Sequence, residues 1–283
     1  MITKVKRLIV IMVLACIGAF LPTIYVAAAD TEPGEKHVYI VPALVFPDDV
    51  QTITQQWQWE YAGGTYAWQV QIPEELVNDS RNVYQAVSRL YYTSNAALQQ
   101  EVIAQYNDPR TLNLMLSLSY AQPRLALWSN DQKHDEYIGQ MALILQNYTS
   151  ELGFDSYATA DFILSWVGAI PYTLTNYTEL PAQTMVDGGD SKGKSILYAA
   201  ILNKLDYSTV FFHYKPSTSS PKGHLAVGIM FETRELPYAD KEYFYYIVGP
   251  ERYYFAETSA SGLQIGDVRS SEIVRLPRVI PTR

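Results

Sequence analysis

The strongest constraint on the fold lies between Ser191 and Thr258, where one helical segment precedes four strand-like segments with no helix between them. In the helical segment, Leu197, Ile201 and Leu205 recur at the spacing of one helix face. The strand-like segments are 208–214, 224–231, 242–248 and 253–258. Consecutive strands without crossover helices pair antiparallel, because parallel neighbours need a long connection. The sequence therefore predicts an α+β fold with an antiparallel sheet.

Upstream of this region the chain predicts a β-hairpin followed by helices. Large side chains alternate with polar residues on both sides of a turn at Gly63-Gly64, which is typical of a hairpin with one packed face. These large side chains are Trp57, Trp59, Tyr61, Tyr66, Trp68 and Val70. Helical spacing then dominates, but the leucines at every second position of 112–118 leave helix and strand both open there. We expect a hairpin and helical region over 37–150 and a second domain over 151–283.

The first 29 residues have the pattern of an export segment. Lys4, Lys6 and Arg7 precede an apolar run that ends in Ala27-Ala28-Ala29, a small-residue motif of the kind that signal peptidases cut. The run is also long enough for a membrane anchor, which needs about 20 residues. Either alternative places the remaining chain outside the cytoplasm. We expect an exported protein, at the cell surface or anchored in the membrane, with a linker over 30–36.

Composition excludes several function classes. The formal net charge of −8 argues against nucleic acid as a partner, because nucleic acid requires a basic face. The one cysteine, Cys16, lies in the N-terminal apolar run, so we expect no disulfide framework. No group of histidines and carboxylates has metal-ligand spacing, and we expect no metal and no cofactor; His134 and His213 are predicted to be structural. Three N-x-[ST] sequons fit glycosylation of an exported chain, and they begin at Asn78, Asn147 and Asn176.

The stretch GGDSKGKS, residues 188–195, matches the G-x-x-x-x-G-K-[ST] pattern of a phosphate-binding loop. Such a loop follows a buried strand, but residues 180–187 contain Pro181 and only scattered apolar positions. The loop also belongs to a doubly wound parallel domain, and no second crossover helix is visible after it. No later strand ends in an aspartate that would hold magnesium. We therefore expect no nucleotide to bind here.

The same stretch is typical of a helix that begins at a nucleophile. Ser191 at the helix start is followed by His224 at the head of one strand and by Glu257 near the end of another. That is the order of nucleophile, base and orienting acid in thiol proteases and transglutaminases. The helix N-terminus would stabilise negative charge on the nucleophile.

Each of these residues also has a purely structural interpretation. Ser191 or Asp190 could do no more than cap the helix, since both residue types are favoured there. His224 could be a hydrogen-bonded core residue, and Glu257 could face solvent from its strand. Lys192 and Lys194 are expected to form a solvated helix end.

Five stretches in a fixed order carry a family resemblance. They are LPAQT at 180–184, GDS at 189–191, GHLAVG at 223–228, YFAET at 254–258 and GLQIG at 262–266. They resemble the P-x-E-T-L, G-D-C-x-D-x-S, G-H-x-A-V-G, Y-x-E-T-T and G-W-x-I-G motifs of the transglutaminase-like superfamily, in particular of its exported archaeal members. The resemblance covers most of the mature chain. It implies a papain-like fold with Ser191, His224 and Glu257 at the catalytic positions and Gln183 and Asp190 at binding positions.

The departures from the family pattern bear directly on the chemistry. Ser191 stands where the family has its cysteine, Gly193 where it has an acid, and Gln183 where it has a glutamate. Leu263 replaces a tryptophan of the family, and one extra residue precedes Glu257 in its motif. A serine hydroxyl cannot ionise in advance as a thiol can, so Ser191 could act only by passing its proton to His224 during attack. We therefore expect a catalytically degenerate protein that binds peptide or polypeptide segments. The alternative is an active serine-based peptidase, amidase or acyl transferase with a Ser-His-Glu triad.

Overall fold

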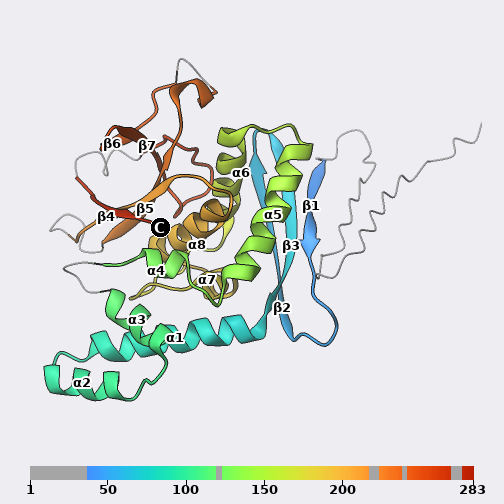
Figure 1. Ribbon diagram of the computed structural model, residues 1–283. Coiled ribbons are helices and arrows are strands. Elements are labelled where there is room, and N and C mark those ends of the chain that lie inside the picture. Colours follow the sequence, from blue (N-terminus) through green and yellow to red (C-terminus); the bar gives the residue numbers. More distant parts are fainter. Residues whose placement is uncertain (1–36, 119–122, 217–222, 238–240, 269–275) are drawn as a thin grey trace, which may run out of the picture.

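The computed structural model describes residues 37–118, 123–216, 223–237, 241–268 and 276–283. The chain is a mixed α+β structure, as predicted, with two sheets and a set of helices (Figure 1). The predicted export segment 1–29 and linker 30–36 lie outside the described residues. Among the residues that are described, no helix combines the length and the apolar character needed to cross a membrane.

The first sheet is built around the predicted hairpin. Its strands are β1 (Val38–Leu44), β2 (Thr52–Tyr61) and β3 (Gly64–Pro73), in the order β1-β3-β2. β2 and β3 are antiparallel, whereas β1 runs parallel to β3. The turn residues are Ala62 and Gly63, with φ of 48° and 82°, and not the expected Gly63-Gly64. Positive φ at both positions is what a tight two-residue hairpin turn requires.

The aromatic stripe of this hairpin is a packed face, as the alternation predicted. Trp57, Trp59 and Trp68 are each at most 6% exposed. Trp57 meets Trp166 with ring centroids 5.5 Å apart, and Trp59 meets Phe162 at 5.4 Å. Both partners lie on α6 (Ser156–Ala169), so the stripe belongs to the core. This core also includes side chains from beyond residue 190, so it is shared by the two predicted domains.

Helices connect and cover the two sheets. Besides α6 they are α1 (Glu74–Tyr92), α2 (Ala96–Ala104), α3 (Pro109–Ser117), α4 (Ala126–Ser129), α5 (Asp135–Glu151), α7 (Pro181–Asp187) and α8 (Ser191–Lys204), with a short 3₁₀ turn, η1 (Thr233–Glu235). α3 resolves the ambiguous 112–118 segment in favour of helix. Asp108 caps it by accepting hydrogen bonds from the amides of Arg110 and Thr111. The alternating leucines therefore do not form a strand, because the cap starts a helix before them.

The second sheet confirms the antiparallel prediction. Its strands are β4 (Thr209–Tyr214), β5 (His224–Met230), β6 (Tyr245–Val248), β7 (Glu251–Ala256) and β8 (Arg278–Pro281), in the order β6-β7-β5-β4-β8. All neighbouring pairs are antiparallel. β8 was not predicted, because four residues are too few to show a periodicity. α8 packs against β4 and β5 and also against α5, α6 and α7, which makes it the central helix of the molecule (Figure 1).

Candidate functional site

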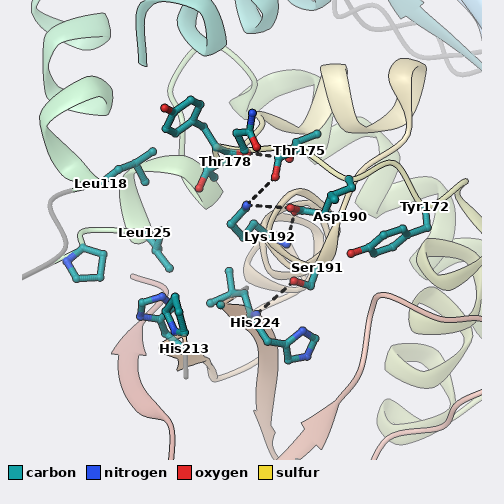
Figure 2. Close-up of a pocket in the computed structure, with 17 residues that line it drawn as sticks. Leu118, Leu125, Tyr172, Thr175, Thr178, Asp190, Ser191, Lys192, His213 and His224 are labelled. Carbon is teal, nitrogen blue, oxygen red and sulfur yellow. Dashed lines mark hydrogen bonds and ion pairs between the residues drawn. The ribbon is translucent and has the colours of Figure 1, made fainter. Parts of the chain in front are cut away.

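Ser191 is the first residue of α8, and it lies in the wall of a cavity of about 350 Å³ (Figure 2). Asp190 is the capping residue, because its carboxylate accepts hydrogen bonds from the amides of Lys192 at 2.8 Å and Gly193 at 3.4 Å. Ser191 is therefore not the cap. The segment before Gly188 is the helix α7, whereas a phosphate-binding loop would follow a strand.

His224 and Glu257 form a hydrogen-bonded pair across neighbouring strands. His224 begins β5 and Glu257 directly follows β7, the strand paired with β5. His224 Nε2 lies 2.8 Å from Glu257 Oε2. Glu257 Oε1 accepts two further hydrogen bonds, from the amide and the hydroxyl of Ser259 at 2.8 and 2.6 Å. Glu257 is only 1% exposed, so it does not face solvent from its strand.

These contacts fix the protonation of the pair. Burial alone would raise the pKa of Glu257, but the hydrogen bonds from His224 and Ser259 lower this pKa to about 2. Glu257 is therefore a carboxylate at neutral pH and can only accept a hydrogen bond. His224 Nε2 must donate, so in the neutral imidazole the lone pair is on Nδ1. Nδ1 is the nitrogen that would take a proton from a nucleophile.

The hydroxyl of Ser191 is bound by the backbone beside this histidine. Leu225, which follows His224, donates its amide proton to Ser191 Oγ at 3.4 Å (Figure 2). Ser195, one helical turn further on, donates to the carbonyl of Leu225 at 3.0 Å. The two serines hold α8 in register against β5. The contact of Ser191 Oγ is thus with the Leu225 amide rather than with the imidazole, and the hydroxyl keeps its own proton for donation.

The cavity has a mixed lining, with leucine and tyrosine side chains beside polar and charged groups. Figure 2 shows Leu118, Leu125 and His213 on one side and Tyr172 beside Ser191 on the other. Further lining residues include Leu174, Tyr177 and Leu225. Lys192 also lines it, and its ammonium contacts Asp190 Oδ2 at 2.8 Å and the carbonyl of Thr175 at 3.2 Å. A cavity of this size lies within the range of small-molecule sites.

His213, which the sequence predicted to be structural, belongs to the cavity lining. Burial lowers the pKa of His213, and the positive charges of Arg278, Lys215 and Lys192 lower it further, so this imidazole is neutral at pH 7. Its Nδ1 is buried without a hydrogen-bond partner in the described part of the chain. The cavity therefore contains a second imidazole that no spacing rule on a single strand would have revealed.

Gln183 does not line the cavity, in contrast to Asp190. Its Nε2 donates to Glu179 Oε1 at 3.4 Å, and both side chains are buried. A Cβ atom on Gly193 would lie 2.8 Å from Glu179 Oε2 and 2.7 Å from Thr184 Oγ1. Glu179 thus occupies the space that a side chain at position 193 would need. A carboxyl group lies beside the start of α8 although position 193 carries no acid.

This carboxyl group is poorly suited to carry a charge. Burial raises the pKa of Glu179 to about 8, and the carboxylates of Asp190 and Asp187 contribute to that rise. Glu179 Oε2, Gln183 Oε1 and Thr184 Oγ1 are buried without hydrogen-bond partners among the described residues. Glu179 is therefore mainly protonated at neutral pH. The sequence did not point to it, because Glu179 lies in the loop directly before the LPAQT stretch and corresponds to no position of that motif.

The structure also bears on the solvated helix end predicted at Lys192 and Lys194 and on the structural role predicted for His134. Lys194 is 1% exposed, so it does not belong to a solvated helix end, whereas Lys192 remains partly exposed. His134, predicted to be structural, is 1% exposed and contacts Ser80 Oγ and Asp131 Oδ2 at 3.0 and 2.7 Å.

No protein-family model matches this chain, and no curated protein or solved structure was found to match it. A functional proposal therefore depends on the residues and the geometry of the site.

Proposed function

We propose that this chain is an exported transglutaminase-like protein with a papain-like fold, a peptide-binding cavity and a catalytically degenerate Ser191–His224–Glu257 site. One observation carries the proposal: a serine at a helix N-terminus and a histidine that is paired with a buried carboxylate line one cavity, while the serine hydroxyl contacts a backbone amide. The order of these elements, a helix followed by antiparallel strands that carry the histidine and the acid, supports the class that the sequence motifs suggest.

The chemistry of oxygen supports a weakened site. A thiol at the first position of α8 would ionise readily beside an imidazole, since a helix N-terminus favours negative charge. A hydroxyl has no such ionised form near pH 7 and depends on accurate contact with its base during attack. Ser191 Oγ contacts Leu225 N at 3.4 Å instead. A misplacement of about 1 Å can reduce a rate on the order of 100-fold.

The second candidate is an active serine-based peptidase, amidase or acyl transferase. It is favoured by the Glu257–His224 contact, which leaves the lone pair of the neutral imidazole on Nδ1. The cap supports it too, because Asp190 binds the amides of Lys192 and Gly193 and not that of Ser191. The Ser191 amide is therefore the candidate donor to an oxyanion.

A fluorophosphonate probe separates the two candidates. The degenerate protein is expected to remain unlabelled while folded, whereas an active serine would be labelled and would lose the label in Ser191→Ala.

Peptide binding is measured independently, by fluorescence polarisation with a library of short peptides. Leu174→Asp, at a 51% exposed cavity position, should weaken binding about tenfold, since about 1.4 kcal/mol corresponds to tenfold. Leu143→Asp, at a 47% exposed position outside the cavity lining, should not.

A cysteine variant tests whether the remaining groups still form a nucleophile site. Ser191→Cys, made with Cys16→Ser to remove the one other thiol, should react with iodoacetamide with a thiol pKa below the ordinary value of about 8.5. Ser156→Cys is the matched control, since Ser156 is the first residue of α6 and follows the capping residue Asp155. Because Ser156 donates to Glu235, the control also carries Glu235→Gln. Equal thiol pKa values at the two positions would mean that His224 does not act on position 191.

A further inference from the structure

Lys194 is a buried cation that the chemistry described above does not use. It lies three residues after Ser191 on α8 and is 1% exposed. Its ammonium donates a hydrogen bond to the carbonyl of Gly168, near the end of α6, at 3.0 Å. A buried ammonium is strongly disfavoured unless a negative charge lies nearby. The position of that negative charge decides what Lys194 does.

The carboxylate whose charge acts on Lys194 is that of Glu257. The residues that follow the two groups in the chain are in contact, since Ser195 Oγ and Thr258 Oγ1 lie 2.9 Å apart. Gly168, the acceptor for Lys194, also lies against the turn after Glu257, because a Cβ atom on it would be 2.8 Å from Ala260 O. Lys194 therefore lies beside the turn that holds Glu257. Burial lowers the pKa of Lys194 to about 8, and the charge of Glu257 opposes that shift.

We propose that Lys194 is a positioning residue that compensates the buried Glu257 carboxylate and thereby lowers the proton affinity of His224. A carboxylate that faces only an imidazole stabilises the imidazolium strongly. When a second cation lies near the carboxylate, the imidazole stays neutral to lower pH. Neutral imidazole is the form that can accept a proton from Ser191. The inference rests on the proposed function in taking His224 as the base of the site.

Other polar groups around the pair do not replace this charge. Tyr214 lies against the His224 ring with ring centroids 5.8 Å apart. Burial raises the pKa of the Tyr172 hydroxyl, and the charges of Asp190 and Glu257 raise it further. Lys192 is paired with Asp190 at 2.8 Å. Among the described residues, Lys194 is a buried cation on which the charge of Glu257 acts.

The test is the pH titration of His224 by NMR, followed on the full-length protein at the ring carbons. Four histidines are present in the sequence, so the signal is assigned with His224→Gln. Lys194→Met should raise the midpoint of His224 by about one pH unit, because a nearby positive charge is lost. Lys194→Arg, which keeps the charge, should restore the midpoint to within about 0.3 units. An unchanged midpoint in folded Lys194→Met would overturn the proposal.

A reciprocal measurement covers the case in which Lys194→Met fails to fold. In the otherwise wild-type protein, Glu257→Gln should lower the midpoint of the Lys194 side chain, because coupling between two titrating groups is mutual. An unchanged Lys194 midpoint would overturn the proposal equally. Neither titration uses a peptide or a probe. A shifted midpoint without peptide binding or labelling would therefore contradict the proposed function and leave the role of Lys194 intact.

Discussion

Two serine–histidine–carboxylate groups are present in the described part of the chain, one sealed beside α1 and the start of α5 and the other at the cavity beside α8. In the sealed group, His134 Nε2 lies 3.0 Å from Ser80 Oγ and His134 Nδ1 lies 2.7 Å from Asp131 Oδ2. All three residues are at most 5% exposed. In the cavity group, only the histidine–carboxylate contact is made, and the hydroxyl of Ser191 contacts Leu225.

The better hydrogen-bonded group is the less suited to chemistry. Ser80 Oγ donates to the carbonyl of Leu76 at 2.7 Å, so its proton is directed at the backbone and not at His134. Asp131 also binds Arg110 through two hydrogen bonds, at 2.6 and 2.7 Å. These contacts tie α1, α3 and the start of α5 together. Access and a hydroxyl proton that is free to move therefore distinguish a candidate site from a structural network of the same residue types.

The largest expected effect follows from removing the charge of the sealed group. Asp131→Asn should lower the free energy of unfolding at pH 7 by about 4 kcal/mol, because it breaks a buried ion pair and leaves Arg110 and His134 without their anion. Urea unfolding measures this. Asp135→Asn is the control, since its side chain is 55% exposed and its pair with Lys204 should contribute less than about 1 kcal/mol. Equal losses in the two variants would show that the sealed group is not a stabilising network.

The contribution of Asp131 to stability depends on pH. Burial opposes ionisation of Asp131, but the hydrogen bonds from His134 and Arg110 prevail and lower its pKa below the ordinary 3.8. A lowered pKa in the folded state means that the contribution to stability is present above about pH 4 and is lost as pH falls through the folded value. The difference between wild type and Asp131→Asn should therefore shrink below pH 4.

The region beside the start of α8 differs from the sealed group, because burial there disfavours the ionised form of a carboxyl group, Glu179. The pKa of Glu179 is raised from 4.5 to about 8, so the ionised form destabilises the fold progressively as pH rises through that interval. Glu179→Gln cannot ionise, and at pH 8 it should be more stable than wild type by about 3 kcal/mol. At pH 4 the two proteins should be nearly equal. Urea unfolding at both pH values is the measurement.

The exposed residue Glu151 on α5 supplies the control for this gain. Glu151→Gln removes the same charge from the surface and should change the free energy of unfolding by less than about 0.5 kcal/mol at either pH. If Glu179→Gln and Glu151→Gln behave alike at pH 8, the carboxyl group of Glu179 does not carry the burial penalty assigned to it. The contrast between the sealed group, whose buried charges are paired, and Glu179, whose buried carboxyl group is not, would then fail.

Local patterns predicted much of the architecture. The alternation around the hairpin, the helix that starts at Asp190-Ser191 and the consecutive strands after it are all present. Once the strands are antiparallel, the meeting of His224 and Glu257 follows from their positions on two paired strands. These features are visible in the sequence because each depends on neighbours within one or two elements.

The features that escaped prediction depend on contacts between distant segments. Ser80 and His134 are 54 residues apart, and nothing in either local sequence indicates the contact. Lys194 looks solvated in the stretch SKGK but is buried, and its ammonium donates to the carbonyl of Gly168 from another helix. Glu179 replaces a missing side chain at position 193 from another part of the chain. Burial and compensation of this kind are properties of the packed molecule.

The close approach of Glu179 to α8 makes an unusual prediction for a helical glycine. Alanine normally stabilises a helix interior by about 1 kcal/mol relative to glycine. Gly193→Ala should instead destabilise by about 2 kcal/mol, because the added Cβ would lie 2.7 and 2.8 Å from buried oxygens of Thr184 and Glu179. Gly139→Ala on α5 is the matched control, since nothing lies within 4 Å of its added Cβ. Thermal unfolding should therefore shift in opposite directions for the two variants.

The smallest effects separate the two serines most directly. Ser80→Ala leaves His134 Nε2 without its hydroxyl partner and should reduce the free energy of unfolding by about 1 kcal/mol. Ser191→Ala removes only an acceptor 3.4 Å from the Leu225 amide and should change it by less than about 0.5 kcal/mol. For reactivity with the probe, Ser191→Ala is expected to have the larger effect and Ser80→Ala the smaller. Any fluorophosphonate labelling detected at high probe concentration should persist in Ser80→Ala and disappear in Ser191→Ala. Labelling that disappears only in Ser80→Ala would mean that the sealed network opens, and the assignment of the two sites would have to be exchanged.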